Sequence, residues 1–294
     1  MEGVTNSIYR KAIIDLDAVD IVATEFIRIT GEKQTISDIV RYKKPLQIQV
    51  MGSSGKTISS CIEYLKSKNK LLENDLLDLN VGCPSKRVNS SGAGAALLKD
   101  PGELAKIVSN IRKVHKGIFS IKTRIGFQSG ESFNEILELL KDCELDFITI
   151  HCRSCSGKYT EKVNYEYLEL ASSKLPYPVI GNGDIWGVAE AKKVLDCGVK
   201  GLMCGRGAII NPFLFNELRA FLDKKHFTVT KDQLRNFCLT LLDTYLEEQK
   251  NTKKNYIGVF KEFSVWFSKN PLIGREFFDS VKLCQSLEEV REKI

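Results

Sequence analysis

Short apolar segments alternate with longer amphipathic segments from the amino terminus to about residue 225. The apolar segments have the length of β-strands, and the segments between them have the apolar spacing of helices. Many repeats of strand and helix indicate a parallel sheet, either open or closed into a barrel. The sequence predicts strands at 21–26, 46–50, 76–81, 120–124, 147–151, 178–181 and 201–204, and helices at 7–16, 58–66, 95–115, 132–142, 165–173, 188–195 and 212–222.

Polar or reactive residues follow nearly every predicted strand. An open sheet would concentrate such residues at one switch point, whereas a barrel gathers them around one mouth. We therefore predict an α/β fold, a (β/α)8 TIM barrel. Seven strands can be counted, so either the barrel is completed in another way or the chain begins downstream of a first strand. The residues at the strand ends are Glu25, Gln49, Cys83, Lys122, Arg124, His151, Arg153, Asn182, Asp184, Gly205 and Arg206.

The pattern changes beyond about residue 225, where apolar residues recur only at helical spacing. We predict a catalytic barrel domain at 1–225 and a small helical bundle domain at 226–294. Basic residues with interleaved aromatics can grip an RNA backbone, but aromatics can also fill a bundle core while lysines remain solvated. The residues in question are Lys250, Lys253, Lys254, Lys261 and Arg275, with Tyr256, Phe263 and Trp266.

Net charge, cysteine spacing and the length of the apolar runs indicate which partners and which compartment to expect. The net charge of +6 leans toward a polyanionic partner such as nucleic acid. Nine cysteines lack the spacing of a secreted disulfide framework, and no charged-then-apolar leader opens the chain, so we expect a reducing cytoplasmic compartment. No apolar run approaches the roughly 20 residues that span a bilayer, so we expect no membrane association.

Cys83 stands just past the predicted strand at 76–81, where Gly82 and Pro84 interrupt the apolar run. The small residues that follow, including Gly92 and Gly94, allow a tightly folded loop. Loops at the carboxyl ends of parallel strands carry the chemistry of such folds. Cys83 is thus a candidate acid, base or nucleophile. The alternative is that it is a small buried hydrophobic residue, as most free cysteines are.

The last two predicted strands carry the glycine-rich segments 178–185 and 201–207. In barrels these two strands commonly build a phosphate site from backbone amides and a helix N-terminus. Arg206 would add a forked donor, and Gly205 would allow close approach of the backbone. The alternative is that the glycines only serve the turns. Cys152 and Cys155 form a lone C-x-x-C pair that lacks the other ligands of a zinc site, so we predict no metal.

Together these motifs resemble the tRNA-dihydrouridine synthases over essentially the whole chain. Details of the cysteine segment and of the segment ending in Trp186 are most similar to the bacterial DusC subgroup, which modifies uridine 16 in the D-loop of tRNA. The matching motifs are Met1-Glu-Gly-Val-Thr, Thr24-Glu-Phe, Asn80-Val-Gly-Cys-Pro-Ser-Lys86, Lys122-Thr-Arg, His151-Cys-Arg, Gly181-Asn-Gly-Asp-Ile-Trp186 and Gly205-Arg-Gly.

The resemblance implies FMN-dependent reduction of a uridine in tRNA to 5,6-dihydrouridine, with NADPH as the reductant. It implies that Cys83 is the proton donor, that tRNA binds the helical domain, and that the protein acts as a monomer. For the substrate uracil it implies contacts from Asn80, Arg153 and Tyr159. For the cofactor it implies Met1, Gln49, Lys122, His151, Asn182, Gly183, Asp184, Gly205 and Arg206.

The sequence departs from the family pattern at three points. The first strand is missing before Met1, Cys152 stands where the family usually has glycine, and Asp184 stands where the DusC subgroup usually has glutamate. Two other functions remain open. One is a small-molecule flavin oxidoreductase of the dihydroorotate or dihydropyrimidine dehydrogenase kind. The other is a truncated barrel that binds tRNA without catalysis.

Overall fold

The computed structural model describes residues 4–31 and 39–294. By its internal contacts the chain divides into two compact units. Unit 1 comprises the chain up to Glu25 together with Asp184–Glu190 and Cys204–Ile294. Unit 2 comprises Phe26–Gly183 and Ala191–Met203.

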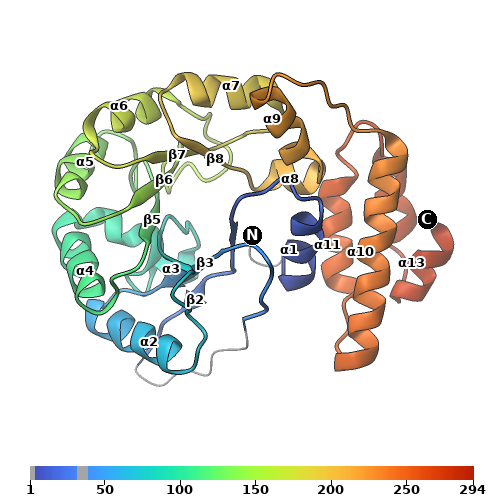
Figure 1. Cartoon of the computed structure of the whole chain (residues 1–294), viewed down its shortest axis with the longest axis horizontal. Helices are drawn as coiled ribbons and strands as arrows, with labels where there is room; N and C mark the ends of the chain where they lie inside the picture. Colours follow the sequence, from blue (N-terminus) through green and yellow to red (C-terminus); the bar gives the residue numbers. More distant parts are fainter. Residues whose placement is uncertain (1–3, 32–38) are drawn as a thin grey trace. The chain divides into compact units, whose positions relative to one another are not determined.

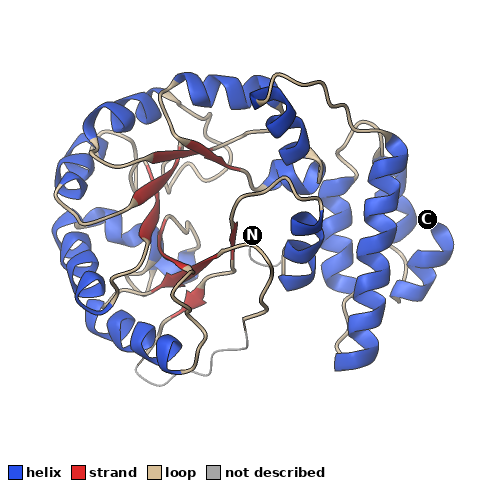
Figure 2. Ribbon diagram, viewed as in Figure 1, coloured by secondary structure: helices blue, strands red, loops and turns tan. Residues whose placement is uncertain are grey.

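Unit 2 is built on a curled parallel sheet surrounded by helices (Figures 1 and 2). Each strand pairs in parallel with the next along the chain, from β2 to β8. This arrangement confirms the predicted α/β fold of the TIM-barrel class. The strands are β2 (Ile27–Arg28), β3 (Leu46–Met51), β4 (Leu76–Val81), β5 (Phe119–Arg124), β6 (Phe147–His151), β7 (Val179–Asn182) and β8 (Gly201–Met203).

Helices α2 (Gly55–Ser67), α4 (Pro101–Val114), α5 (Phe133–Lys141) and α6 (Glu166–Lys174) lie along the outside of this sheet (Figure 1). A short helix α3 (Lys86–Asn89) and a 3-10 helix η1 (Gly94–Lys99) follow β4. The single helix predicted at 95–115 is therefore wrong, because η1 and α4 are separate. Asp100 caps α4 by accepting a hydrogen bond from the Glu103 amide, and Pro101 stands in its first turn.

The sheet has one apolar and one polar face because successive side chains of a strand point to opposite sides. Ile48, Leu77, Leu79, Ile121 and Ile148 are fully buried, and their alternation with polar residues places them on the face that the outer helices cover. Most of the alternate positions of β3, β4, β5 and β6 carry polar side chains, and the exceptions are Met51, Leu76 and Phe147. The interior face of the sheet is therefore available for polar chemistry.

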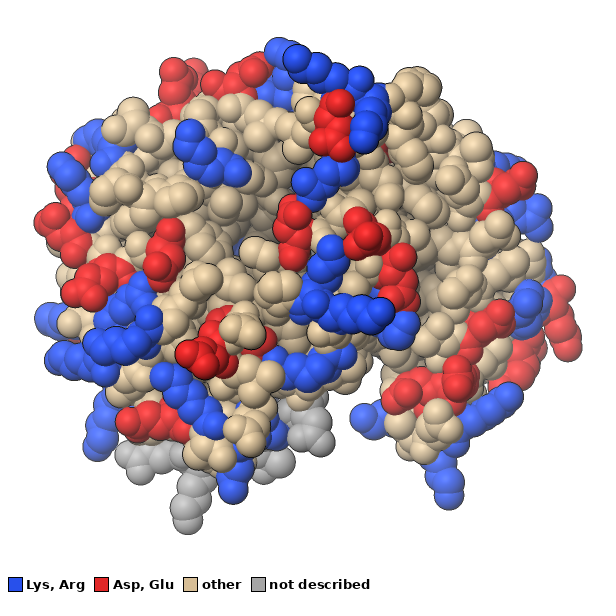
Figure 3. Space-filling view, viewed as in Figure 1, with Lys and Arg blue, Asp and Glu red and all other residues tan. Residues whose placement is uncertain are grey.

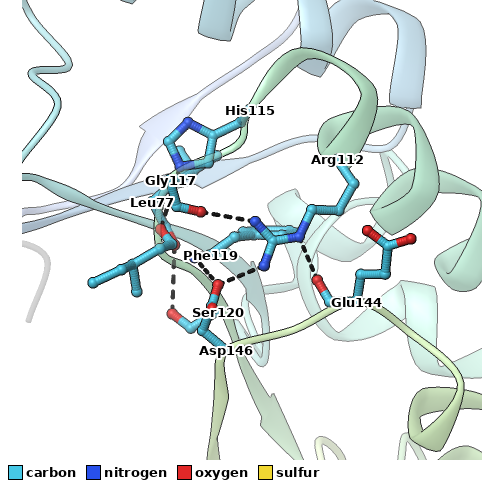
Figure 4. Close-up of polar contacts among 9 residues, drawn as sticks. Leu77, Arg112, His115, Gly117, Phe119, Ser120, Glu144 and Asp146 are labelled. Atoms are coloured by element: carbon cyan, nitrogen blue, oxygen red, sulfur yellow. Dashed lines mark hydrogen bonds and ion pairs between the residues drawn. The ribbon is translucent and has the colours of Figure 1, made fainter.

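Arg112 connects the segments that lead into β5 and β6 (Figure 4). Its guanidinium donates to the carbonyl oxygen of Gly117 at 2.7 Å and to that of Glu144, and it pairs with the carboxylate of Asp146. Asp146 also accepts the backbone N–H of Phe119 at 2.8 Å. These contacts fix the amino ends of the strands, a location that contributes stability in barrels and leaves the carboxyl ends for function.

Unit 1 joins an N-terminal helix to the C-terminal helices. The ring of Tyr9 packs 6.2 Å from that of Phe237 and 5.9 Å from that of Phe263, and its hydroxyl donates to the carbonyl oxygen of Ala208 at 2.7 Å. The elements are α1 (Ser7–Asp15), β1 (Val22–Ala23), α8 (Arg206–Ile210), α9 (Leu214–Leu222), α10 (Lys231–Thr252), α11 (Ile257–Phe267), α12 (Arg275–Val281) and α13 (Leu287–Lys293). Helix α7 (Val188–Asp196) begins in unit 1 and ends in unit 2.

The structure also bears on the strand predicted at 21–26 and on the aromatic residues of the C-terminal helices. The strand predicted at 21–26 is wrong in extent, because β1 covers Val22–Ala23 and β2 begins at Ile27. Of the aromatics weighed between a core and an RNA-binding role, Phe263 is 1% exposed and belongs to the core. Among the described residues no helix is long and apolar enough to cross a membrane. The domain boundary at residue 225 stays a prediction.

Candidate active site

The polar face of the unit 2 sheet is arranged in three rows that rise toward the carboxyl ends of the strands. The rows follow from the register of the parallel strands, because residues paired across neighbouring strands share a face. The first row is Gln49, Asp78 and Ser120, the second is Asn80, Lys122 and Thr149, and the third is Arg124, His151 and Asn182.

A continuous line of hydrogen bonds connects Asp78 in the first row, through Gln49 and Asn80, with the loop that carries Cys83. Asp78 Oδ2 accepts from Gln49 Nε2 at 2.7 Å, and Gln49 Oε1 accepts from Asn80 Nδ2 at 2.8 Å. Asn80 Oδ1 then accepts the backbone N–H groups of Gly82 and Cys83, each at 3.0 Å. The line connects a carboxylate in the sheet interior with the backbone of the candidate catalytic residue.

Asp78 is fully buried and Lys122 is half-buried, and desolvation shifts the pKa values of both side chains. Desolvation raises the pKa of Asp78 to about 6, although hydrogen bonds from Ser120 and Gln49 and the charge of Lys122 oppose the shift. Desolvation, together with the neighbouring charge of Arg124, lowers the pKa of Lys122 to about 8. Asp78 and Cys83 act in the opposite direction by stabilising the ammonium. At neutral pH the interior therefore holds a carboxylate and an ammonium.

Cys83 is half-buried at the start of the loop after β4. It packs against a small apolar cluster of Met51, Val88 and Ala93, and its carbonyl oxygen accepts the N–H of Ala95 at 3.2 Å. Its backbone N–H donates to Asn80 of the second row at 3.0 Å. Cys83 is thus neither fully buried nor remote from the polar face. Its role as proton donor stays a prediction.

Arg124 links two loops at the carboxyl ends of the strands. It is 3% exposed, and its Nε donates to the carbonyl oxygen of Gly82 at 2.8 Å. Its Nη1 donates to the carbonyl oxygens of Ser154 at 2.8 Å and Lys158 at 3.3 Å, and its guanidinium lies 5.7 Å from the centre of the Tyr159 ring. The loop after β6 is consequently held against the loop that carries Cys83.

The last residue of β6 and the loop that follows it contain three of the predicted site residues. His151 is 6% exposed, and its ring lies 6.2 Å from that of Tyr159, which is 54% exposed. Arg153 is buried and donates from Nε to the carbonyl oxygen of Glu161. The carboxylate of Glu161 accepts the backbone N–H and the hydroxyl of Ser154. These bonds fold the loop back on itself and leave Tyr159 at the surface.

The remaining predicted cofactor residues fall in both units. In unit 2, Asn182 Nδ2 donates to the carbonyl oxygen of Met203 at 2.6 Å, and Gly183 has a φ of +136°, which favours glycine. In unit 1, Arg206 donates to Asp184 Oδ1 at 2.6 Å and lies 5.0 Å from the Trp186 ring. Gly205 precedes helix α8. Met1 lies outside the described residues.

The chain is similar to known proteins over essentially its whole length. A model of the dihydrouridine synthase family matches residues 1–293. The chain belongs to the dihydrouridine synthase family. It is 26% identical to the tRNA-dihydrouridine(16) synthase of Haemophilus influenzae, with all of this chain and 97% of that protein aligned.

Other dihydrouridine synthases are similar over part of the chain. The tRNA-dihydrouridine(16) synthase of Pseudomonas syringae is 30% identical over 75% of this chain and 73% of its own length. A tRNA-dihydrouridine(47) synthase-like protein of Xenopus laevis is 31% identical over 63% of this chain, which spans 28% of that longer protein. The part shared with the Xenopus protein is thus a fraction of a larger chain.

The structure joins Gln49, Asn80 and the Cys83 backbone by hydrogen bonds, and Asn80 pairs with Lys122 on the neighbouring strand. Sequence reasoning did not assign a site role to Asp78 or to Arg124. One signal for Asp78 was present, because a carboxylate between Leu77 and Leu79 in a strand predicted to be buried requires hydrogen-bond partners. Arg124 was part of a matching motif, but its contacts to two loops cannot be inferred from the motif.

The distribution of surface charge does not by itself locate an RNA-binding surface. In the face drawn in Figure 3, Lys and Arg side chains are interspersed with Asp and Glu side chains. The net charge of +6 is therefore not concentrated in one block on that face. Any RNA contact has to be argued from individual residues.

Proposed function

We propose that this protein is an FMN-dependent tRNA-dihydrouridine synthase that reduces a uridine in the D-loop, at position 16, with NADPH as the reductant. The observation that supports the proposal is that the backbone N–H of Cys83 donates to Asn80, which pairs with Lys122 on the neighbouring strand, in a chain of the dihydrouridine synthase family. Position 16 is supported by the similarity to the Haemophilus and Pseudomonas enzymes.

The polar rows of unit 2 fit the ring system of a flavin. Lys122 supplies a half-buried positive charge, which suits the electron-rich edge of a reduced flavin. The hydroxyl oxygen of Thr149, in the same row, is buried and has no hydrogen-bond partner among the described residues. A buried hydroxyl of this kind normally has a partner, and a bound ring would supply one. When bound, the flavin supplies the hydride for the uracil C6.

The protein's own residues would complete the reduction. Addition of hydride at C6 leaves negative charge at C5, which must be neutralised by a proton. The thiol of Cys83 would donate this proton. The ammonium of Lys122 would stabilise negative charge in the site, where the low dielectric strengthens its effect. Gln49 and His151 would hydrogen-bond the ring of the cofactor.

Substrate recognition would use the loops above the polar rows. The target base must leave its stack in the folded tRNA to reach the site. Asn80, Arg153 and Tyr159 would contact the extruded uracil, and the exposed ring of Tyr159 offers it a stacking surface. We assign the ribityl chain and phosphate of FMN to Asn182, Gly183, Asp184, Gly205 and Arg206, as the sequence predicts.

The decisive experiment maps dihydrouridine in tRNA from cells that lack the gene and from cells complemented with the parent or with Cys83→Ala. We expect dihydrouridine at position 16 to disappear on deletion, to return with the parent, and to stay below about 1% with the alanine variant. Unchanged dihydrouridine on deletion would contradict the proposed activity. Full restoration by the variant would remove Cys83 from the proton-donor role.

Two further measurements separate the alternatives. A small-molecule flavin oxidoreductase would reduce free uracil or oxidise dihydroorotate at a rate comparable with its rate on tRNA, whereas we expect no turnover of either free base. A non-catalytic barrel would be colourless, whereas we expect the purified protein to carry the absorbance of an oxidised flavin.

A further inference from the structure

The side-chain amides of Gln49 and Asn80 connect Asp78 with the backbone of Cys83 through hydrogen bonds. Its side chain is 0% exposed, and its Oδ1 accepts from the hydroxyl of Ser120 at 2.6 Å while its Oδ2 accepts from Gln49. Neither the proposed proton donation nor the proposed cofactor contacts use this carboxylate directly. A buried carboxylate is costly unless it is fully hydrogen-bonded, so its presence calls for a structural or functional reason.

The chemistry of a carboxylate fixes the polarity of the whole line. An ionised carboxylate only accepts hydrogen bonds, so Gln49 must turn its NH2 group toward Asp78 and its oxygen toward Asn80. Asn80 must then turn its own NH2 group toward Gln49 and its oxygen toward the backbone N–H groups of Gly82 and Cys83. If either amide were reversed, two donors or two acceptors would face each other.

We propose that Asp78 is a positioning residue for Cys83, because its carboxylate orients the Gln49 and Asn80 amides and through them holds the Gly82–Cys83 backbone in place. This inference rests on the proposed function only in giving Cys83 a catalytic role. The hydrogen-bond line itself consists only of the protein's own residues. With the Asn80 amide oriented in this way, one N–H of Nδ2 donates to Gln49 and the second N–H remains a donor for a bound base.

The proposal is tested by amide hydrogen exchange at Gly82 and Cys83 in the flavin-free protein, measured by NMR. In Asp78→Ala we expect both amides to exchange about five- to tenfold faster relative to the sheet amides of Leu77 and Ile121, because the oxygen of Asn80 loses its fixed orientation. The matched control is Ser120→Ala, which removes a hydrogen bond to Asp78 that lies outside the line to Cys83. We expect that control to leave both amides within about twofold of the parent.

Asp78→Asn distinguishes orientation from charge. Asparagine can present its oxygen to Gln49 and its NH2 group to the oxygen of Ser120, so we expect it to restore slow exchange at Gly82 and Cys83. If exchange in Asp78→Asn is as fast as in Asp78→Ala, hydrogen-bond polarity is not the cause and the proposal fails. Exchange that is equally slow in Asp78→Ala and in the Ser120→Ala control also overturns it.

A second variant keeps the test informative if Asp78→Ala does not fold. Gln49→Met interrupts the line in its middle and leaves the bond between Asp78 and Ser120, so we expect the same acceleration at the Gly82 and Cys83 amides. Parent-like exchange in this variant contradicts the proposal. On tRNA we expect Asp78→Ala to lower kcat by about tenfold with little change in KM.

The exchange measurement needs neither tRNA nor turnover. A protein with the expected exchange pattern but no dihydrouridine synthesis would contradict the proposed function alone. A protein that makes dihydrouridine but lacks the pattern would contradict the positioning role alone.

Discussion

The Nε of Arg124 donates a hydrogen bond of 2.8 Å to the carbonyl oxygen of Gly82, the residue directly before Cys83. The same peptide segment donates its N–H groups to Asn80 on the other side. The backbone that carries the candidate proton donor is therefore held from two neighbouring strands. Such double restraint is what a catalytic group needs, because a displacement of about 1 Å can cost a hundredfold in rate.

We expect Arg124→Met to lower dihydrouridine synthesis about a hundredfold, because both the Cys83 loop and the loop after β6 lose an anchor. The rate is measured with saturating tRNA and compared with thermal stability. The matched control is Arg112→Met, which removes a comparable number of hydrogen bonds at the opposite ends of the strands. We expect the control to lose stability by about 1–3 kcal/mol but to keep its activity at a temperature where it is folded. Equal loss of activity in both variants would show that Arg124 acts only through stability.

The charge of Lys122 should depend on Asp78. Burial lowers the pKa of Lys122 to about 8, and the carboxylate of Asp78 raises it within that environment. Asp78→Asn removes a favourable charge, so we expect the Lys122 pKa to fall further and activity to decline at a lower pH than in the parent. NMR of lysine labelled at Cε in the flavin-free protein measures this pKa directly. An unchanged pKa would refute the electrostatic link, and Asp146→Asn at the far end of the strands serves as the control.

The lowered pKa of Lys122 makes the free energy of unfolding depend on pH. The folded-state pKa of Lys122 lies below the value of about 10.4 expected in the unfolded chain, so the unfolded chain binds the proton more tightly. This lysine therefore lowers the free energy of unfolding most at pH values below 8. This loss of free energy of unfolding becomes smaller as the pH rises above 8, and it is absent above about pH 10.4.

The sequence predicted the elements of unit 2 well because their signals are local. Leu76, Leu77, Leu79 and Val81 form an apolar run whose interruption at Gly82 marked both the strand and its reactive end. The orientation of Asp78 toward Gln49 could not be predicted, since it depends on the register between strands that are about 30 residues apart. The packing of Tyr9 against Phe237 and Phe263 is equally non-local. Sequence periodicity identifies an apolar face but not its partner.

Gly94 limits the space beside Cys83. Its φ is +62°, and a Cβ at this position would lie 2.8 Å from Val88 Cγ1 and 3.1 Å from Cys83 Cβ. We expect Gly94→Ala to displace Cys83, to cost about 1–2 kcal/mol of stability and to reduce activity about tenfold or more. The rate of Cys83 alkylation by iodoacetamide, followed by mass spectrometry of its peptide, reports the displacement.

Gly92→Ala separates backbone strain from the clash. Gly92 also has a positive φ, of +73°, but a Cβ there would meet only Ser53 Cβ at an ordinary 3.5 Å. We expect a similar loss of stability with parent-like alkylation of Cys83. If both variants change the alkylation rate equally, the contact between Gly94 and Cys83 has no special effect.

Lys253 and Lys254 follow directly after α10, where they are exposed, and they belong to the basic set that the sequence assigned to tRNA. Each phosphate contact adds roughly one unit to the dependence of log Kd on log salt concentration. We therefore expect the double variant Lys253→Gln/Lys254→Gln to weaken tRNA binding about tenfold and to reduce that slope by about two. Fluorescence anisotropy at several salt concentrations measures both quantities.

The matched control for this pair is Lys192→Gln/Lys193→Gln, which removes two adjacent exposed lysines from α7 and so makes the same change in net charge. We expect the control to change the affinity for tRNA by less than about twofold, because distant exposed charges are screened at physiological salt. If both pairs weaken binding equally, tRNA affinity depends on net charge and not on contacts after α10. If neither pair has an effect, the lysines after α10 only solvate the helical bundle, and the aromatic residues there serve its core.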